Sequence, residues 1–346
     1  MHWSPSPREP RGLVLGPMVG AAPVGASRPD RGSLFHELMT GSGTFLGVVH
    51  ETGGGIYAVV LETGERVDAS LRGSLKKKDR TGRVVVIGDI VEVLVDGNEV
   101  TIESVSKRQT ELVRRGRGRA PKILAANLDR VFVVIALREP RGSTQLIDRM
   151  LALVHASGMR PLLILNKADL EGTEDLEETW LTLYRGIGYK VLVTSVSSGE
   201  GVVELHRELC SGTSAFIGPS GVGKSSLLNV VEPGLQLRIG RLSQKTGTGR
   251  HTTVSARLIT LECGGLVADT PGFGDVALWS VDPETVGSHF PEFAESAVNC
   301  RFRGCTHLHE PGCAVLEEVG KGVIARSRYE SYCFLRADAE EQQEEY

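Results

Sequence analysis

Residues 218–226, which read "GPSGVGKSS", have the spacing G-x-x-x-x-G-K-[ST] of a loop that binds nucleotide phosphates. An apolar run precedes the loop and a helical pattern follows it, which is the context that this motif requires. In such a loop the glycines turn backbone N–H groups toward the phosphates, and the helix N-terminus adds positive potential. Lys224 is expected to act in catalysis by neutralising the β and γ phosphates, and the Ser225 hydroxyl to bind Mg²⁺. The predicted nucleotide contacts from this loop are Gly218, Pro219, Ser220, Gly221, Val222, Gly223, Lys224, Ser225 and Ser226.

The sequence "NKAD" at 166–169 follows the apolar run "PLLIL" and has the residue types of a loop that reads guanine. The Asp169 carboxylate can accept hydrogen bonds from both N1–H and the exocyclic amine of guanine, and the adenine edge cannot supply both. Asn166 is expected to tie this base loop to the phosphate loop, and the Lys167 stem to pack on the base. The later "TSV" offers the backbone N–H after Ser195 to the guanine oxygen. Combined with the phosphate loop, these residues predict binding of GTP and GDP.

Two further segments carry groups for Mg²⁺ and for the γ phosphate. In "VADTPGFGD", Asp269 ends an apolar run and is expected to join the Mg²⁺ shell, and the Gly272 N–H is expected to sense the γ phosphate. In "TGTGRHTTV", Thr252 or Thr253 is expected to reach Mg²⁺ when a γ phosphate is present. The predicted magnesium ligands are therefore Ser225, Thr253 and Asp269, with Thr252 as the alternative to Thr253.

The order of these motifs along the chain is unusual. Each follows an apolar, β-branched run, and helical patterns separate several of the runs, which predicts a mainly parallel sheet covered on both faces. Ligands of such sheets bind beyond the carboxyl ends of the strands. Here the base loop precedes the phosphate loop, whereas ordinary GTPases have the reverse order. Each motif lies at the end of its own strand, so the site depends on how the strands are arranged in the sheet and not on their order along the chain. We therefore interpret residues 128–278 as a circularly permuted P-loop GTPase domain of the α/β class.

A cysteine-rich segment follows the nucleotide motifs. "CRFRGCTHLHEPGC" has the spacing C-x4-C-x-H-x5-C, and three thiolates with one imidazole suit a single closed, structural zinc site. The predicted ligands are Cys300, Cys305, His307 and Cys313, with His309 as an alternative nitrogen ligand. Buried free thiols beside a surface histidine are the competing interpretation. We interpret residues 279–346 as a zinc-binding, mainly helical domain that ends in a helix and an acidic tail.

The N-terminal part divides into three segments. Residues 1–42 are rich in Pro, Gly, Ser and Arg and are interpreted as a disordered leader, with Met39 as a second candidate start. Residues 43–110 hold short β-type runs between Gly-rich turns, which predicts a small barrel, either of the oligonucleotide-binding (OB) type or generic. Its loops carry Lys76, Lys77, Lys78 and Arg80. Residues 111–127 are interpreted as a basic linker. The stretch "KRQTELVRRGRGRAPK" at 107–122 supplies its charge and is expected to be flexible, either merely solvated or able to clamp phosphates.

Composition narrows the classes of function. The chain has 346 residues, 40% hydrophobic and 24% charged, with a net charge of −4 at pH 7, so nucleic-acid binding must depend on local basic patches. No apolar run has the length of a membrane-spanning helix. The six cysteines do not suggest a disulfide framework and indicate a reducing compartment with a metal. Cys210, Cys263 and Cys333 lack metal-binding company and are interpreted as structural.

The order NKAD, TSV, GPSGVGKSSLLN, GRHTT, DTPGF and C-x4-C-x-H-x5-C, behind an OB-like barrel, resembles the RsgA or YjeQ family of bacterial GTPases. The resemblance covers about residues 43–335, and residues 1–42 lie outside it. It implies a GTP hydrolase that is stimulated by the small ribosomal subunit and binds this particle late in its assembly. It also implies contacts of all three domains with ribosomal RNA, and release of the protein on hydrolysis. A monomer in the cytoplasm suits such a factor.

Two positions depart from familiar patterns. The family usually has a third threonine after "GRHTT", and this chain has Val254. Many GTPases place a water-orienting glutamine after the DTPG glycine, and this chain has Phe273, which cannot orient water. His251 is the candidate for that catalytic role, by its place in the "GRHTT" loop and by the resemblance, because a histidine can orient or deprotonate water. The alternative is that His251 contacts RNA or only positions its loop.

Other classes of function compete with this interpretation. A zinc-handling or metal-delivery GTPase would use the cysteine cluster as a transfer site. A non-catalytic RNA-binding protein would use the nucleotide only structurally. A kinase that uses ATP is the least favoured class. The adenine edge cannot supply the two hydrogen-bond donors that the Asp169 carboxylate is expected to bind.

Overall fold

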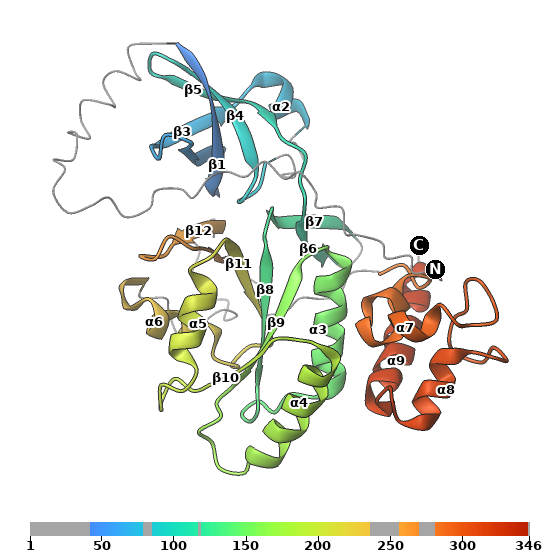
Figure 1. The fold of residues 1–346 in the computed structure, drawn as a ribbon. Helices are drawn as coiled ribbons and strands as arrows, with labels where there is room; N and C mark the ends of the chain where they lie inside the picture. Colours follow the sequence, from blue (N-terminus) through green and yellow to red (C-terminus); the bar gives the residue numbers. More distant parts are fainter. Residues whose placement is uncertain (1–41, 79–84, 117–118, 236–255, 270–280, 345–346) are drawn as a thin grey trace, which may run out of the picture.

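The computed structural model describes residues 42–78, 85–116, 119–235, 256–269 and 281–344. These residues form an N-terminal barrel, a central domain built on a parallel sheet, and a C-terminal helical domain (Figure 1). This arrangement confirms the multidomain fold class that the sequence predicts. Within the described ranges, no helix combines the length and the apolar character needed to cross a bilayer.

The barrel is a five-stranded sheet that closes on itself. Its strands are β1 (Gly43–Gly53), β2 (Ile56–Leu61), β3 (Arg66–Leu71), β4 (Ile90–Asp96) and β5 (Glu99–Val105), and the short helix α2 (Gly73–Lys78) follows β3. The strand order is β1-β2-β3-β5-β4, and β4 also pairs with β1. Val91, Val93 and Val95 of β4 are buried while Glu92 is exposed, which is the alternation of a strand with one face in a core. The side chains of Lys76, Lys77, Lys78 and Arg80 lie outside the described part.

Residues 111–127 are predicted to be a flexible linker, but most of the described part forms two paired strands instead. β6 (Glu111–Gly116) pairs antiparallel with β7 (Arg119–Ala126) in a separate two-stranded sheet. Just before this hairpin, Arg108 donates to both carboxylate oxygens of buried Asp89 in the barrel, over 2.6 and 2.8 Å. The prediction of a flexible linker was therefore wrong, because the glycines and basic residues of this stretch did not prevent β6 and β7 from pairing. Arg108, one of the basic residues of that stretch, pairs with a protein carboxylate.

The central domain has a sheet in which one edge strand runs against the others. Its strands are β8 (Arg130–Ala136), β9 (Arg160–Asn166), β10 (Val191–Thr194), β11 (Thr213–Ile217), β12 (Ala256–Thr260) and β13 (Leu266–Asp269). Their order is β10-β9-β8-β11-β13-β12, and only the β12–β13 pair is antiparallel. β12 also pairs with β1 of the barrel, so the two domains share one continuous sheet. The mainly parallel sheet predicted from the apolar runs is confirmed.

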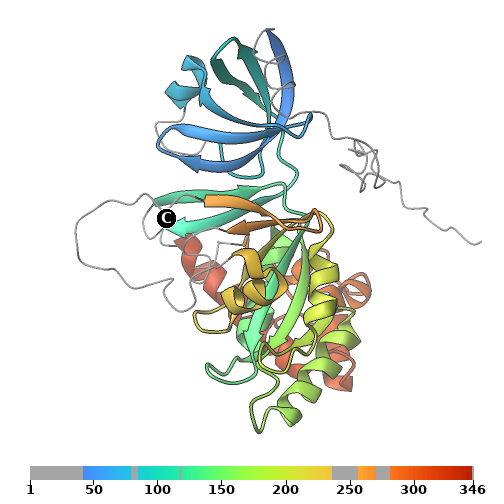
Figure 2. The same cartoon turned by 90° about the vertical axis from the view of Figure 1, so that its left-hand side faces the viewer.

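Helices cover both faces of this sheet (Figures 1 and 2). They are α3 (Thr144–Ala156), α4 (Glu174–Ile187), α5 (Val202–Leu209) and α6 (Lys224–Val231), with the short turn η2 (Pro233–Leu235) after α6. Val131, Val133 and Ile135 of β8 belong to the core shared with α3 and α4. Phe132 and Val134 belong to the opposite core, shared with α5 and α6. Burial on both faces explains why the strand is a continuous apolar run without alternation.

The C-terminal domain packs its helices around a cluster of aromatic rings. Its elements are η3 (Val286–His289), η4 (Pro291–Phe293), α7 (Ala294–Ala297), α8 (Ala314–Lys321) and α9 (Arg326–Glu344). Tyr332 of α9 meets Phe290 and Phe293 edge-on, with ring centroids 5.7 and 5.2 Å apart. α9 lies against α3 of the central domain (Figure 1).

A buried cation joins the C-terminal domain to the central domain. The Arg328 side chain of α9 is 1% exposed and donates to Asp148 of α3 over 2.6 Å. It also donates twice to Glu292, over 2.6 and 3.0 Å, and its guanidinium carbon lies 4.6 Å from the ring centroid of Phe290. Burial raises the pKa of Asp148, and the Arg328 charge opposes that rise. The hydroxyl of Tyr184 donates to the same carboxylate over 2.6 Å.

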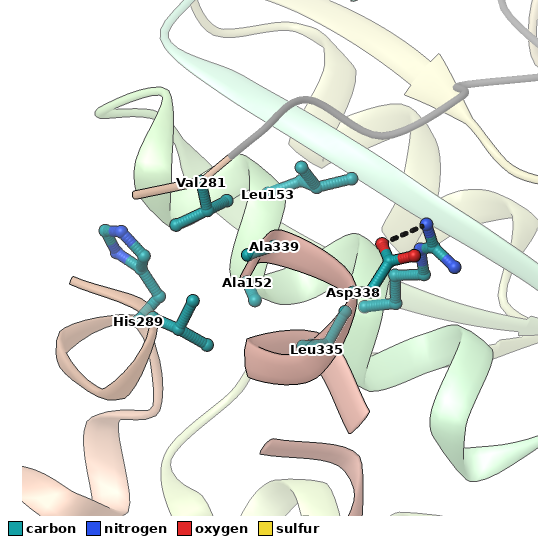
Figure 3. A pocket seen from close by; sticks show the side chains of 9 residues that line it. Ala152, Leu153, Val281, His289, Leu335, Asp338 and Ala339 are labelled. Atoms are coloured by element: carbon teal, nitrogen blue, oxygen red, sulfur yellow. Dashed lines mark hydrogen bonds and ion pairs between the residues drawn. The ribbon is translucent and has the colours of Figure 1, made fainter. Parts of the chain in front are cut away.

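A small crevice lies between α3, α9 and η3 (Figure 3). Arg149 donates to Asp338 across one side of it over 3.0 Å, and Leu335 and His289 are among its lining residues. Its volume of about 20 Å³ accommodates roughly one water molecule, which is far too small for a nucleotide. Val281, which also lines it, is the first described residue after the DTPG segment.

Candidate nucleotide and metal sites

The predicted nucleotide motifs follow strands that end at one edge of the central sheet. Asn166 at the end of β9 pairs with Ala136 of β8 and with Thr194 of β10, and all three strands are parallel. β11 ends at Ile217 between β8 and β13, and β13 ends at Asp269. The carboxyl edge therefore gathers the base loop, "TSV", the phosphate loop and the Asp269 carboxylate.

The phosphate loop between β11 and α6 has backbone geometry that favours glycine. Gly218, Gly221 and Gly223 have positive φ angles of 149°, 83° and 100°. A Cβ added at Gly218 would lie 2.1 Å from the Val134 carbonyl oxygen, and one at Gly223 would lie 2.3 Å from the Asn166 amide nitrogen. Side chains at these two positions would collide with the strand and the base loop that shape the site.

Lys224 begins α6 and folds back over the phosphate loop. Its Nζ donates to the carbonyl oxygens of Gly218 and Pro219, over 2.7 and 2.8 Å. Ser225 and Ser226 are half-buried in the first turn of the same helix. Elsewhere in the loop Val222 is buried, Pro219 is half-buried and Ser220 is exposed. An ammonium beside a helix N-terminus is suited to holding phosphate oxygens.

Asn166 links the base loop to the phosphate loop. Its Nδ2 donates to the Val222 carbonyl oxygen over 2.7 Å, and its Oδ1 accepts from the Thr194 hydroxyl over 2.9 Å. The side chain is buried, so these bonds replace water. The separation between the two loops is thereby fixed, as a ligand that spans both of them requires.

Two serine hydroxyls orient the Asp169 carboxylate. Ser195 donates to Oδ1 over 2.6 Å and Ser197 donates to Oδ2 over 2.5 Å. These hydrogen bonds, that from Ser195 first, lower the pKa of Asp169 and keep it an acceptor. Asp169 is itself exposed, and each carboxylate oxygen retains a further lone pair for a ligand donor. Sequence reasoning missed Ser197, although a serine two residues after Ser195 was visible.

Lys167 has a backbone conformation that side chains rarely adopt, with φ of 64°. Its Nζ donates to the carbonyl oxygen of Glu139 in the loop between β8 and α3. The Lys167 stem is therefore held between two loops at the same sheet edge. Sequence reasoning did not anticipate the partner Glu139, because contacts between loops leave no periodic pattern.

The magnesium side of the site is only partly within the described residues. The Asp269 carboxylate at the end of β13 accepts from Arg257 of β12 over 3.1 Å. Thr252, Thr253, His251 and Gly272, predicted to contact Mg²⁺, the γ phosphate or the attacking water, lie outside the described part. Hydroxyl and carboxylate oxygens are donors that Mg²⁺ accepts, so Ser225 and Asp269 fit this ion chemically.

The four predicted zinc ligands lie together in the C-terminal domain. The ligand atoms of Cys300, Cys305, His307 and Cys313 all lie within 4.8 Å of one another. Two contacts with neighbouring helices and one within the loop hold this segment. Cys313 Sγ caps α8 by accepting from the Leu316 N–H over 3.5 Å, and Tyr329 of α9 donates to the His307 carbonyl oxygen over 2.9 Å. Glu310 accepts from the Thr306 N–H over 2.6 Å.

The distances among Cys300, His307 and Cys313 are close to those of tetrahedral zinc. Bonds of about 2.3 Å to sulfur and 2.0–2.1 Å to nitrogen give edges of roughly 3.6–3.8 Å between ligand atoms. His307 Nδ1 lies 3.4 Å from Cys313 Sγ and 3.6 Å from Cys300 Sγ, and the two sulfurs are 4.0 Å apart. His309 is exposed and does not belong to this cluster, so the structure favours His307 as the nitrogen ligand.

Comparison with known proteins places these motifs in one family. The family model described as RsgA GTPase matches residues 105–279. A protein of Gemmatimonas aurantiaca called small ribosomal subunit biogenesis GTPase RsgA is 42% identical, over 84% of this chain and 96% of its own length. This chain belongs to the RsgA GTPase family. The resemblance seen in the sequence is therefore confirmed.

Two solved structures agree with the fold. YjeQ from Thermotoga maritima is 34% identical with a TM-score of 0.72, covering 86% of this chain and 98% of its own. YloQ, described as a circularly permuted GTPase, is 30% identical with a TM-score of 0.69, covering 87% and 96%. The circular permutation inferred from the motif order thus has a counterpart among solved structures.

One interpretation of the cysteines in this RsgA-family chain was wrong. Cys210 and Cys263 do not lack company: they form a disulfide across 53 residues, and His206 lies beside them. The spacing could not reveal this pair, because its two members come from different elements, α5 and the β12–β13 turn. Cys333 is a free, half-buried thiol.

Proposed function

We propose that this chain binds and hydrolyses GTP, is stimulated by the small ribosomal subunit, and acts in a late step of that subunit's maturation. Hydrolysis of GTP to GDP and phosphate drives its release from the particle. The observation that carries the nucleotide assignment is the Asn166 amide, which bonds the base loop to the Val222 carbonyl oxygen of the phosphate loop. The names of the relatives support the assignment of the particle. In this proposal the protein works as a monomer in the cytoplasm.

The residues of the carboxyl edge divide the work on GTP. Asp169 accepts from the guanine N1–H and amine, and Lys167 packs its stem on the base. The backbone N–H groups of the phosphate loop and Lys224 hold the phosphates, with Lys224 exchanging its two carbonyl partners for phosphate oxygens. Ser225, Thr253 and Asp269 would hold Mg²⁺. When bound, this ion neutralises charge that develops on the β and γ oxygens.

The connections of the site support a switch that reaches both neighbouring domains. The segment 236–255, which carries "GRHTT", continues into β12, and β12 pairs with β1 of the barrel. The segment 270–280 after Asp269 continues into Val281, which lines the crevice with α3 and α9. A γ phosphate that binds these segments would therefore bias the barrel and the C-terminal domain together. Both domains, with the GTPase domain, are proposed to contact ribosomal RNA.

We propose that Cys300, Cys305, His307 and Cys313 bind one Zn²⁺ with a structural role. When bound, the ion would cross-link the loop from Cys300 to Cys313 and so stabilise its fold. Burial of Cys313 and His307, and the cap that Cys313 forms on α8, favour retention of the metal. A delivery function would need a more open site, so metal handling is the weaker alternative.

The decisive test is GTP hydrolysis by the purified protein alone, with the small ribosomal subunit, and with the large subunit. We expect the small subunit to raise turnover at least tenfold, because binding orders groups around the γ phosphate that electrostatic catalysis requires. The large subunit is the matched control and should leave turnover unchanged. Stimulation by neither particle would remove the ribosome from the proposal while leaving the nucleotide site.

His251→Ala is expected to lower turnover stimulated by the small subunit about 100-fold and to leave GTP affinity unchanged. The reason is that an imidazole able to orient or deprotonate water acts in the chemical step and not on the base. Steady-state hydrolysis and equilibrium GTP binding are the measurements, and His309→Ala, at an exposed histidine, is the control. Turnover that survives in His251→Ala would assign the role to another group.

A further inference from the structure

The turn between β12 and β13 packs directly on the C-terminal end of α5. A Cβ added at Gly265 would lie 1.8 Å from the Leu209 carbonyl oxygen, so only glycine allows this approach of the two backbones. Next to it, the Leu266 N–H donates to the Gly212 carbonyl oxygen over 3.0 Å. These noncovalent contacts hold the turn close to the helix.

Two cysteines meet at this contact. Cys210 caps α5 and Cys263 lies in the turn, with their Cα atoms 5.3 Å apart. Disulfides usually join Cα atoms that are about 4.4–6.8 Å apart, so the backbone already has the separation that the bond requires. Cys263 is exposed and Cys210 is half-buried, which leaves the pair accessible to small reagents.

The surroundings give the two sulfurs different roles. Cys210 stands at a helix C-terminus, where the carbonyl ends disfavour a negative thiolate. His206, one turn earlier, places Nδ1 3.7 Å from the Cys210 sulfur, where an imidazole can accept the thiol proton. Cys263 lies off the helix and is more exposed, so it is the better first nucleophile.

We propose that Cys210 and Cys263 form a reversible thiol–disulfide site that reacts with low-molecular-weight disulfides. The Cys263 thiolate attacks one sulfur of the small disulfide, whose S–S bond breaks, and one small thiolate leaves and takes up a proton. The Cys210 thiolate then attacks the Cys263 sulfur, and the second small thiol leaves. The protein loses two electrons and two protons in all, and the small disulfide becomes two thiols. An excess of the small thiol reverses both steps.

The bond encloses a functional part of the chain. The loop closed between residues 210 and 263 contains the phosphate loop and the "GRHTT" segment, and the pinned hairpin ends at Asp269. Redox state would therefore act on the same hairpin that connects the nucleotide edge to β1. Neither thiol–disulfide step involves GTP, so this chemistry does not depend on GTP hydrolysis.

The test equilibrates the full chain with mixtures of oxidised and reduced glutathione, then traps free thiols by alkylation and maps them by mass spectrometry. In excess oxidised glutathione we expect Cys210 and Cys263 to escape alkylation and to be found in one linked peptide pair. In excess reduced glutathione we expect both to be alkylated. Cys333→Ser is the control and should behave like the unaltered chain. Alkylation of both thiols in excess oxidised glutathione would overturn the proposal.

Variants separate the two steps. Cys210→Ser should stop after the first step and retain glutathione on Cys263. His206→Gln should slow closure of the internal bond about tenfold and leave its equilibrium ratio unchanged, since it acts on the rate of proton transfer. An equal closure rate would overturn the positioning role of His206. Zinc content should be one equivalent both in the reduced chain and in Cys210→Ser. A second equivalent that Cys210→Ser loses would make the pair a metal site instead.

Discussion

Asp169→Asn is expected to weaken GTP binding about 10³-fold and to create binding of xanthosine triphosphate. The asparagine oxygen can still accept from N1–H, but that acceptor is no longer ionised, and the amide NH2 faces the exocyclic amine of guanine as a second donor, so one hydrogen bond is weakened and the other is lost. The new amide instead donates to the carbonyl oxygen that xanthine carries where guanine has its amine. Ser195 and Ser197 hydroxyls can reverse their direction toward an amide, so the loop should keep its shape.

The measurement is equilibrium binding of both nucleotides to the two proteins. Asp175→Asn removes the same charge from an exposed position in the first turn of α4 and serves as the control. The control should bind GTP as the unaltered chain does. Unchanged preference for GTP in Asp169→Asn would mean that another group reads the base.

Arg328→Met is expected to lower the free energy of unfolding by about 3–5 kcal/mol. Removal of one partner leaves the buried carboxylate of Asp148 and the partly buried carboxylate of Glu292 without their cation, and an uncompensated buried charge is costly. Methionine keeps much of the apolar volume, so the loss of charge dominates. Urea unfolding measures the change.

The charge argument can be separated from packing on the same helix. Arg326→Met removes an exposed arginine two residues earlier on α9 and should change the free energy of unfolding by less than about 0.5 kcal/mol. Adding Asp148→Asn and Glu292→Gln to Arg328→Met should recover part of the lost stability, since neutral amides cost less to bury. No recovery would assign the loss to packing alone.

Local sequence signals predicted the parts of the molecule that depend on strand ends. "GPSGVGKSS" and "NKAD" each follow an apolar run, and parallel strands place such ends at one edge, so the site could be assembled without coordinates. The barrel was accessible for a similar reason, because Val91, Val93 and Val95 alternate with more exposed neighbours. Cys300 to Cys313 formed a cluster because all four ligands lie within one short loop.

Contacts between distant segments carried no such signal. Arg328 and Asp148 are 180 residues apart, and an arginine in a helical pattern reads as a surface residue. The pairing of β12 with β1 depends on the position of the barrel relative to the central sheet, which no local pattern in the sequence indicates. The paired strands β6 and β7 were misinterpreted because their basic composition outweighed their short apolar runs, and the contact of Arg108 with Asp89 just before them leaves no pattern in the sequence.

The order of strands in the central sheet also bears on synthesis. As the chain leaves the ribosome that makes it, β8 can pair with β9 and β9 with β10. β11 then adds at the open side of β8, and β13 arrives with β12 as a hairpin at the open side of β11. No strand has to insert between two that are already paired, so the permuted order lets the sheet grow outward as residues emerge. The edge strand of this sheet, β12, then pairs with a barrel whose five strands have already been made.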